Sequence, residues 1–375
     1  MGADELLKLQ GSRLLVVHQG AVGDLILALP AVTVLRESLR PARLEMLGHS
    51  WTLPLALRHP YADAIRDING SEFVPLFQQD APFPLNLTQY LTAFNAAFVF
   101  SRTTTLARNL KRAGIEKTFT LPSFPDERRH VSDHHLLSLQ SVGIATRPML
   151  SPLPFLTLRK EEKARAEEFF LRQGWGLDEI VALHPGAGSR KKAWPPHRFA
   201  AIGQALAAHG KRIVLIQGPA DEAAAAEVHT LLAGTPHLLV HDSPIATLAP
   251  LLSRVSLFIG NDSGISHLAA ALGVPVLAIF GPTDPAVWAP RGKQAFWLQG
   301  KAPCALCKST TLLTCDKQRC LASIQVEDVM AFLVEKKIIK RKSAAAREKL
   351  AQLAQRVQRV HPRQGKKGIS PLSPP

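Results

Sequence analysis

The sequence lacks any apolar run of the roughly 20 residues that a membrane-spanning helix needs. Its first residues, MGADELLKLQGSR, include acidic side chains and no apolar core, so we expect no secretory signal and a cytoplasmic protein. Cysteine is scarce, and all 4 cysteines lie in the segment CALCKSTTLLTCDKQRC. In a cytoplasmic protein such a cluster favours thiols or a metal site over a disulfide framework.

Acidic residues are nearly missing from the C-terminal segment. From Lys336 onward the chain has 12 lysines and arginines and one acidic residue, Glu348, so +11 of the net charge of +15 belongs to this segment. The remainder is only mildly basic, and the segment has neither interleaved aromatic residues nor a base-reading motif. We therefore expect no nucleic acid partner. Attraction to an anionic membrane surface is a better use of such a tail.

The length of 375 residues exceeds what one hydrophobic core usually holds, so we expect two domains. In both halves short apolar runs alternate with amphipathic stretches, which is typical of parallel sheets covered by helices. The proline-rich segment TRPMLSPLPFLTL separates the halves. We predict an α/β fold with two facing Rossmann-like domains, 1–155 and 156–338, an interdomain cleft, and a basic, disordered tail at 339–375.

Individual elements follow from the same periodicity. The predicted strands are 13–18, 43–47, 97–100, 180–183, 212–216, 256–259 and 275–280, and the predicted helices are 24–40, 104–113, 132–142, 161–173, 196–209, 221–233, 265–272 and 326–336.

The segment HQGAVGD, residues 18–24, joins the first predicted strand to the first predicted helix. Gly20 and Gly23 permit a tight turn and the close approach of another molecule. Asp24, on the first helical turn, has a carboxylate that can accept a proton from a substrate hydroxyl. The alternative is that Asp24 only caps the helix. The loop does not have the GxGxxG pattern, so no dinucleotide site is expected.

Two later loops have features of phosphate binding. HPGAGSRKKAWP, residues 184–195, follows a predicted strand with small residues, a hydroxyl and cations; a solvated basic loop is the alternative. GNDSGISHLAAA, residues 260–271, leads from a strand into a helix whose first N–H groups suit a diphosphate. In the alternative interpretation Asp262 is the N-cap and His267 is structural.

Two shorter turns follow other predicted strands. GPADE, residues 218–222, offers a carboxylate for a ribose diol, with helix-start charge complementarity as the alternative. GPTDP, residues 281–285, could line the same pocket. Each motif is weak alone, but all fall at the carboxyl ends of predicted strands, where one cleft would collect them.

The motifs HQGAVGD, HPGAGSRKKAWP and GNDSGISHLAAALGVPVLAIFGPTDP closely resemble those of the ADP-heptose–lipopolysaccharide heptosyltransferase family, glycosyltransferase family 9, over about residues 13–320. The resemblance implies a GT-B fold, with the acceptor on the N-terminal domain and the nucleotide sugar on the C-terminal one. It implies inverting, metal-independent transfer of heptose from ADP-heptose to a lipid-linked inner-core acceptor of the lipid A–Kdo type, without a cofactor. The expected location is cytoplasmic, at the inner face of the inner membrane.

By matching position, the resemblance implies that Asp24 is the general base and Lys192 the catalytic lysine that contacts the donor. Many members have arginine and serine where this chain has His18 and Gly20; these positions, with Gly23, would face the acceptor, whose identity stays open. The implied donor-binding residues are Ser189, Glu222 or its neighbour Asp221, Asp262, Ser263, Gly264 and His267.

Two other functions stay open. A nucleotide-sugar epimerase of GT-B fold would need no acceptor and would release no free ADP. A non-catalytic sugar-binding relative is the second, although an intact Asp24 and basic loop argue against it. A structural zinc site is a further alternative because the CxxC pair has ligand spacing, but we expect free thiols and no metal. The cysteines concerned are Cys304, Cys307, Cys315 and Cys320.

Overall fold

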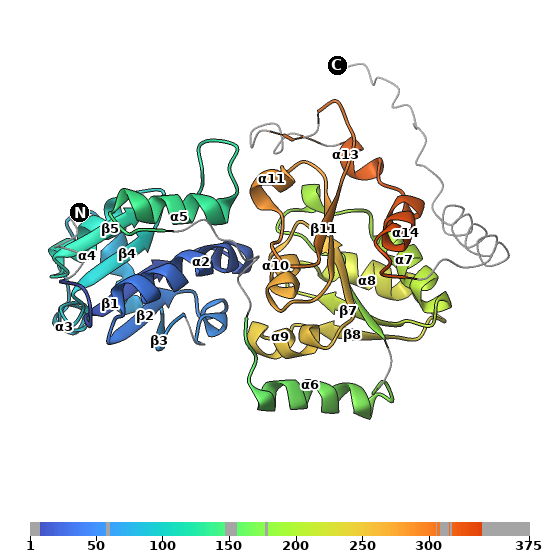
Figure 1. The fold of residues 1–375 in the computed structure, drawn as a ribbon, viewed down its shortest axis with the longest axis horizontal. Helices are drawn as coiled ribbons and strands as arrows, with labels where there is room; N and C mark the ends of the chain where they lie inside the picture. The colour runs from blue at the N-terminus through green and yellow to red at the C-terminus, as the bar shows by residue number, and fades with distance from the viewer. Residues whose placement is uncertain are drawn as a thin grey trace, which may run out of the picture.

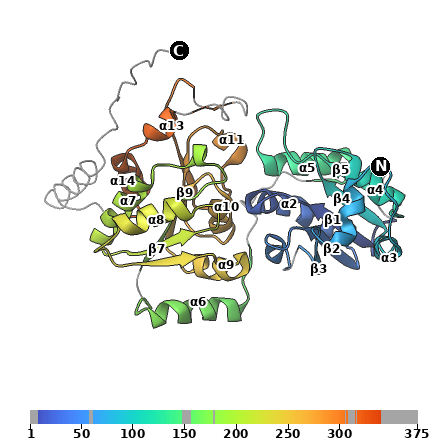
Figure 2. The same ribbon diagram turned by 180° about the vertical axis from the view of Figure 1, so that it is seen from behind.

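A computed structural model of the protein describes residues 8–57, 61–146, 156–176, 179–304, 306–307, 315 and 317–339. These residues form two α/β units side by side, each with its own sheet (Figures 1 and 2). The predicted α/β fold with parallel sheets is confirmed. Nearly all of the predicted tail and most of the predicted linker lie outside the described residues.

The N-terminal sheet has five parallel strands in the order β3-β2-β1-β4-β5. Its central strand is continuously apolar because helices cover both faces of the sheet. The strands are β1 (Arg13–His18), β2 (Arg43–Gly48), β3 (Ala64–Asp67), β4 (Ala96–Phe100) and β5 (Lys117–Leu121); the helices are α2 (Val22–Leu39), η1 (Leu53–Leu55), η2 (Ser71–Phe77), α3 (Leu85–Leu91), α4 (Thr105–Arg112) and α5 (Val131–Ser141).

The C-terminal sheet has six strands in the order β11-β10-β9-β6-β7-β8, all parallel. Its strands are β6 (Ile180–His184), β7 (Arg212–Gln217), β8 (His237–His241), β9 (Leu257–Asn261), β10 (Val276–Phe280) and β11 (Ala295–Gln299). Its helices are α6 (Lys160–Arg172), η3 (Arg190–Lys192), α7 (Pro196–Ala208), α8 (Glu222–Leu231), α9 (Ile245–Ser253), α10 (Gly264–Ala271), α11 (Pro285–Trp288), α13 (Arg319–Ala322) and α14 (Val326–Glu335).

Alternate residues of β1 serve the two faces of the first sheet. Leu14 and Val16 pack with the apolar residues of α2, whereas Leu15 and Val17 pack with those of α3 and α4. The cluster that contains Leu14 also includes residues of α10 and α9, so one apolar core continues from the first unit into the second. Among the described residues, no helix is both long enough and apolar enough to cross a membrane.

The two units meet where α2 and α10 lie against each other, beside their N-termini (Figures 1 and 2). Glycine is required at this contact, because a Cβ atom on Gly264 would lie 2.9 Å from the backbone nitrogen of Gly23. Ion pairs add to the junction: Arg128 contacts Asp284, and Asp133 accepts a hydrogen bond of 2.7 Å from Arg291. Because strand ends of both sheets face this junction, it is the place to look for a site.

Candidate active site

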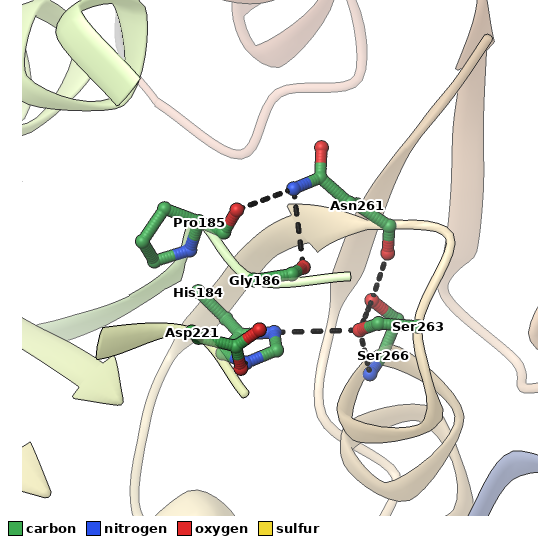
Figure 3. Close-up of polar contacts among 7 residues, drawn as sticks. All are labelled: His184, Pro185, Gly186, Asp221, Asn261, Ser263 and Ser266. Carbon is green, nitrogen blue, oxygen red and sulfur yellow. Dashed lines mark hydrogen bonds and ion pairs between the residues drawn. The ribbon is translucent and has the colours of Figure 1, made fainter. Parts of the chain in front are cut away.

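Asn261, the last residue of β9, holds the loop that follows β6 (Figure 3). Its side-chain amide donates to the carbonyls of Pro185, at 2.8 Å, and Gly186, at 3.1 Å, and its oxygen accepts from the N–H of Trp194, at 2.9 Å. The residue is fully buried, so each of these bonds replaces water that cannot reach it. The loop with the predicted phosphate-binding residues is therefore tied to the neighbouring strand.

A chain of polar side chains joins the ends of β6, β7 and β9 (Figure 3). His184 places Nε2 2.9 Å from Asp221 and Nδ1 3.3 Å from the hydroxyl of Ser263. Ser263 is the N-cap of α10, where its hydroxyl accepts from the N–H of Ser266. The interpretation of Asp262 as this N-cap is therefore wrong, because the serine one residue later has the capping geometry.

A cavity of about 520 Å³ lies beside His184 and Asp221, with walls from both domains. Residues 217–221, after β7, form part of the wall, and Ser50, Trp51 and Pro54 of the N-terminal domain form another. Asp221 lines the cavity, whereas Glu222 is exposed on the first turn of α8. The sequence leaves the choice between these two carboxylates open, and the lining of the cavity favours Asp221 as the one that would contact a ligand.

Lys192 and Asp262 form an ion pair near the junction. The Lys192 ammonium lies 2.9 Å from the Asp262 carboxylate, which also accepts a hydrogen bond of 2.7 Å from Thr283 in the GPTDP turn. Asp262 is 6% exposed, so without these partners its charge would be buried and uncompensated. Ser189 starts this basic turn, and its hydroxyl accepts from the N–H of Lys191. Cation, hydroxyl and carboxylate are therefore held in fixed positions beside the start of α10.

Asp24 lies on the first turn of α2 and accepts a hydrogen bond of 3.0 Å from the backbone N–H of Ala21. The capping interaction is thus present, and it uses one of the two carboxylate oxygens. Burial raises the pKa of Asp24; the bond from Ala21 and the charge of Lys192 lower this pKa, and the charge of Asp262 raises it. Lys192 and Asp262 belong to the other domain, so the structure brings all three charged groups into one site.

In the first loop His18 and Gly23 are buried, and Gly20 is half-buried. The His18 ring is 4% exposed and lies edge-on to Phe100, 5.8 Å away between ring centroids. A Cβ atom on Gly20 would meet this ring at 2.8 Å, and one on Gly23 would meet His267 at 3.1 Å. These residues shape the loop that holds Asp24, and their contact with an acceptor stays a prediction.

A family model for glycosyltransferase family 9, described as heptosyltransferase, matches residues 96–315, more than half of the chain. The chain belongs to glycosyltransferase family 9. It is therefore a glycosyltransferase, as the resemblance of its motifs implied. The match begins after the loop that contains Asp24, so the role of this residue must be argued from its surroundings.

Similar proteins agree with the family. Lipopolysaccharide heptosyltransferase 3 of Escherichia coli K12 is 26% identical over 284 residues, which cover 72% of this chain and 82% of the relative. A crystal structure of a family 9 glycosyltransferase from Veillonella parvula has a TM-score of 0.73 at 19% identity, covering 88% of this chain and 97% of that one. The E. coli heptosyltransferase WaaC with ADP has a TM-score of 0.60 at 19% identity, covering 86% and 99%. The fold matches these two structures, and the predicted GT-B fold is confirmed.

Several residues of the candidate site have individual roles that the sequence does not assign, although Asn261 and Thr283 lie within the predicted motifs. Arg102 follows the carboxyl end of β4 and lowers the pKa of Asp24 by its charge. Asn261 and Thr283 position the basic loop and Asp262, respectively. Arg102 had a signal that could have identified it, since it lies shortly after a predicted strand. Thr283 and Asp284 belong to the GPTDP turn that was predicted to line the pocket, but the pairing of Asp284 with Arg128 of the other domain has no local signal.

The four cysteines of this glycosyltransferase are free thiols. The Sγ of Cys307 donates to the carbonyl of Cys304 at 3.1 Å, and Cys320 is buried. Within the described ranges, no group of three or more histidine, cysteine or acidic side chains is arranged to hold a metal ion.

Buried histidines surround Asp24 and the domain junction. Burial lowers the pKa of His18, His130 and His267 to about 4 and that of His135 to about 3. In three of them, His18, His135 and His267, Nδ1 has no hydrogen-bond partner among the described residues. These rings are therefore neutral in the folded protein at neutral pH.

Acid should unfold the wild type steeply because of these histidines. Their folded-state pKa lies below the unfolded value of about 6.5, so the unfolded chain binds more protons between about pH 4 and 6.5. The contribution of each neutral, buried histidine to folding stability is fully present above about pH 6.5. It is lost as the pH falls toward the folded-state pKa, at about 1.4 kcal/mol per pH unit. We expect His135→Phe to unfold at a lower pH than the wild type in acid titrations followed by circular dichroism. A substitution of the exposed His241, His241→Asn, serves as the control. Equal unfolding pH values for His135→Phe and the wild type would refute the prediction that the neutral His135 ring makes the fold sensitive to acid.

Proposed function

We propose that the protein transfers heptose, with inversion, from ADP-heptose to the inner core of lipopolysaccharide, on a lipid-linked acceptor of the lipid A–Kdo type. Membership of family 9 supports the reaction class. The names of the E. coli relative and of the structure with ADP support the donor and the acceptor class. The observation that carries the proposal is the close approach of Gly23 and Gly264, because it brings the neighbouring Asp24 to the domain junction opposite the ion pair of Lys192 and Asp262.

The donor is expected to bind mainly on the C-terminal domain. Its nucleoside occupies the cavity, with the ribose hydroxyls toward the Asp221 carboxylate. The diphosphate lies at the N-terminus of α10, where unpaired N–H groups and the helix dipole favour negative charge. Ser189 and Lys192 belong to the loop after β6, and Lys192 is paired with Asp262, two residues before α10. No cofactor takes part.

The reaction proceeds as a direct displacement. The Asp24 carboxylate removes the proton from an acceptor hydroxyl, and the oxygen of this hydroxyl forms a bond to the anomeric carbon of the donor sugar. The bond from this carbon to the phosphate oxygen breaks on the opposite face, and ADP leaves with the electron pair. Lys192 and the N–H groups at the start of α10 stabilise the charge that develops on the leaving phosphate. Because burial raises the pKa of Asp24, its carboxylate is a stronger base than an exposed one.

Incubation of purified protein with ADP-heptose and a Kdo-bearing lipid A acceptor tests the proposal. We expect free ADP and glycosylated lipid in equal amounts, with the anomeric configuration of the product opposite to that of the donor. A GT-B epimerase would convert the sugar nucleotide without acceptor and without ADP release. A sugar-binding relative would bind ADP-heptose without turnover. Either result would overturn the proposal.

We further propose that the basic segment after Lys336 attracts the protein to the inner face of the inner membrane. Each lysine or arginine near an anionic surface contributes about 1 kcal/mol, within a Debye length. Removing residues 340–375 should therefore abolish most co-sedimentation with phosphatidylglycerol vesicles at low salt and leave transfer to a delipidated acceptor unchanged. High salt should release the full-length chain. Equal partitioning of both chains at low salt would refute this role.

A further inference from the structure

The cavity beside the site is built by both domains, and its N-terminal wall contains an exposed tryptophan. Trp51 follows β2 and is 53% exposed, although it lines the cavity. It is the only Phe, Tyr or Trp among the described residues that line this cavity. This exposure is unusual for a tryptophan, because a large indole normally buries its rings, and it suggests that a ligand contacts the ring.

The Trp51 side chain is positioned by a stacking contact within its own domain. Its indole stacks on the His49 ring at 5.6 Å between centroids, with 14° between the planes. His49 is fixed in turn by Asn69, at 3.2 Å from Nδ1, and Asn69 donates to Asp67 at 2.8 Å. About half of the Trp51 surface, 53%, remains exposed. The loop after β2 thus presents a braced, flat aromatic surface to the cavity.

Aliphatic side chains of the C-terminal domain form much of the remaining wall. Ile216 at the end of β7, Val240 on β8 and Ile245 and Leu248 on α9 all line the cavity. A planar, weakly polar ring is suited to such a space, because it can stack on the indole and contact the aliphatic side chains together. The nucleoside base of a nucleotide sugar is such a ring, and Asp221 lines the same cavity where the ribose would follow.

We propose that Trp51 stacks on the base of the donor nucleotide, so that the base is bound by both domains. The inference rests on the proposed function for the presence of a nucleotide donor, and extends it to a residue of the other domain. Stacking would then contribute to donor affinity from the N-terminal domain, while the C-terminal wall of the cavity holds the rest of the nucleoside.

Binding measurements with ADP and with inorganic pyrophosphate separate base contact from phosphate contact. Base–aromatic stacking predicts that Trp51→Ala weakens ADP binding by about 5- to 100-fold and leaves pyrophosphate binding unchanged. Trp51→Phe should retain most of the ADP affinity, because it keeps an aromatic face. Trp297→Ala is the matched control, since Trp297 is 45% exposed on β11 and does not line the cavity. Melting temperatures of the variants establish that each one is folded.

Two further readouts are specific to stacking. ADP should quench the indole emission of the wild type and of Trp297→Ala but have little effect on Trp51→Phe. In transfer assays, Trp51→Ala should raise the KM for the donor and leave kcat close to the wild-type value, because stacking on the base is the same in the ground and transition states.

The failure of the inference differs from failure of the proposed function. If the wild type binds ADP and Trp51→Ala binds it equally well, Trp51 does not contact the base. If the variant loses ADP and pyrophosphate equally, the loop has a structural role and the inference is also wrong. A wild type that releases no ADP from ADP-heptose in the presence of acceptor would instead overturn the proposed function. Trp51-dependent binding of another nucleoside diphosphate in that case would preserve the stacking role.

Discussion

Replacing Asp24 with asparagine is expected to lower the rate of transfer by about 10²–10⁴-fold while ADP affinity stays near that of the wild type. Asparagine is nearly the same size and can still accept the hydrogen bond from the Ala21 N–H, so the start of α2 is kept. It cannot remove a proton from the acceptor hydroxyl. Steady-state rates at saturating donor, together with calorimetric titration of ADP, measure both effects.

The pH dependence gives an independent check on the same residue. Burial raises the pKa of Asp24 above that of an exposed carboxyl, so the wild-type rate should start to fall at a higher pH than for an ordinary aspartate. The asparagine variant should have no such acid limb. Because the folded-state pKa is raised, the favourable contribution of protonated Asp24 to folding is present at low pH and is lost as the pH rises through the folded pKa. Asp24→Asn should therefore be at least as stable as the wild type at neutral pH.

Asp63→Asn is a suitable control, because Asp63 pairs with Arg36 on the N-terminal domain outside the cavity. We expect it to keep the wild-type rate and pH profile. If Asp24→Asn retained near-normal turnover, the only role of Asp24 would be the cap that its bond to Ala21 provides.

The central strands of both sheets could be predicted from the sequence, and the edge strands could not. Strand β1 occupies the predicted residues, Arg13–His18, because a parallel strand covered on both faces is continuously apolar. The edge strand Ala64–Asp67 is only half-buried and contains charged residues, so its short apolar signal is diluted. The same holds for Lys117–Leu121, in which four of five residues are half-buried. Burial on both faces of the sheet produces a continuous apolar run, and the less buried edge strands lack such a run.

The candidate site could also be predicted only in part from the sequence. Motifs at strand ends indicate one edge of each sheet, and Lys192 and Asp262 do lie together there. How the two domains face each other is decided by helix contacts such as Gly23 against Gly264, which no local pattern encodes. For this reason the sequence gives no role to Trp51, which acquires one only where the N-terminal loop meets the C-terminal cavity.

Replacing Lys192 with alanine is expected to lower kcat by about 10²–10³-fold and to weaken ADP binding by about tenfold or more. The ammonium is held 2.9 Å from Asp262 and is available to the diphosphate both before and during its departure. Its loss also leaves the Asp262 carboxylate, 6% exposed, with Thr283 as its remaining side-chain hydrogen-bond donor among the described residues. Because Lys192 is itself partly exposed, we expect a loss of folding stability on the order of 1–3 kcal/mol.

A second substitution separates these two effects. In the double variant Lys192→Ala with Asp262→Asn, the neutral amide no longer leaves a buried charge, so stability in urea titrations should return toward the wild type. Activity should not return, because the positive charge at the leaving phosphate is still missing. Arg190→Ala, which removes an exposed cation from the same turn, is the control and should keep most of the rate. If the double variant recovered both stability and turnover, Lys192 would serve only to neutralise Asp262, and the developing charge on ADP would have to be met by the N-terminus of α10 alone.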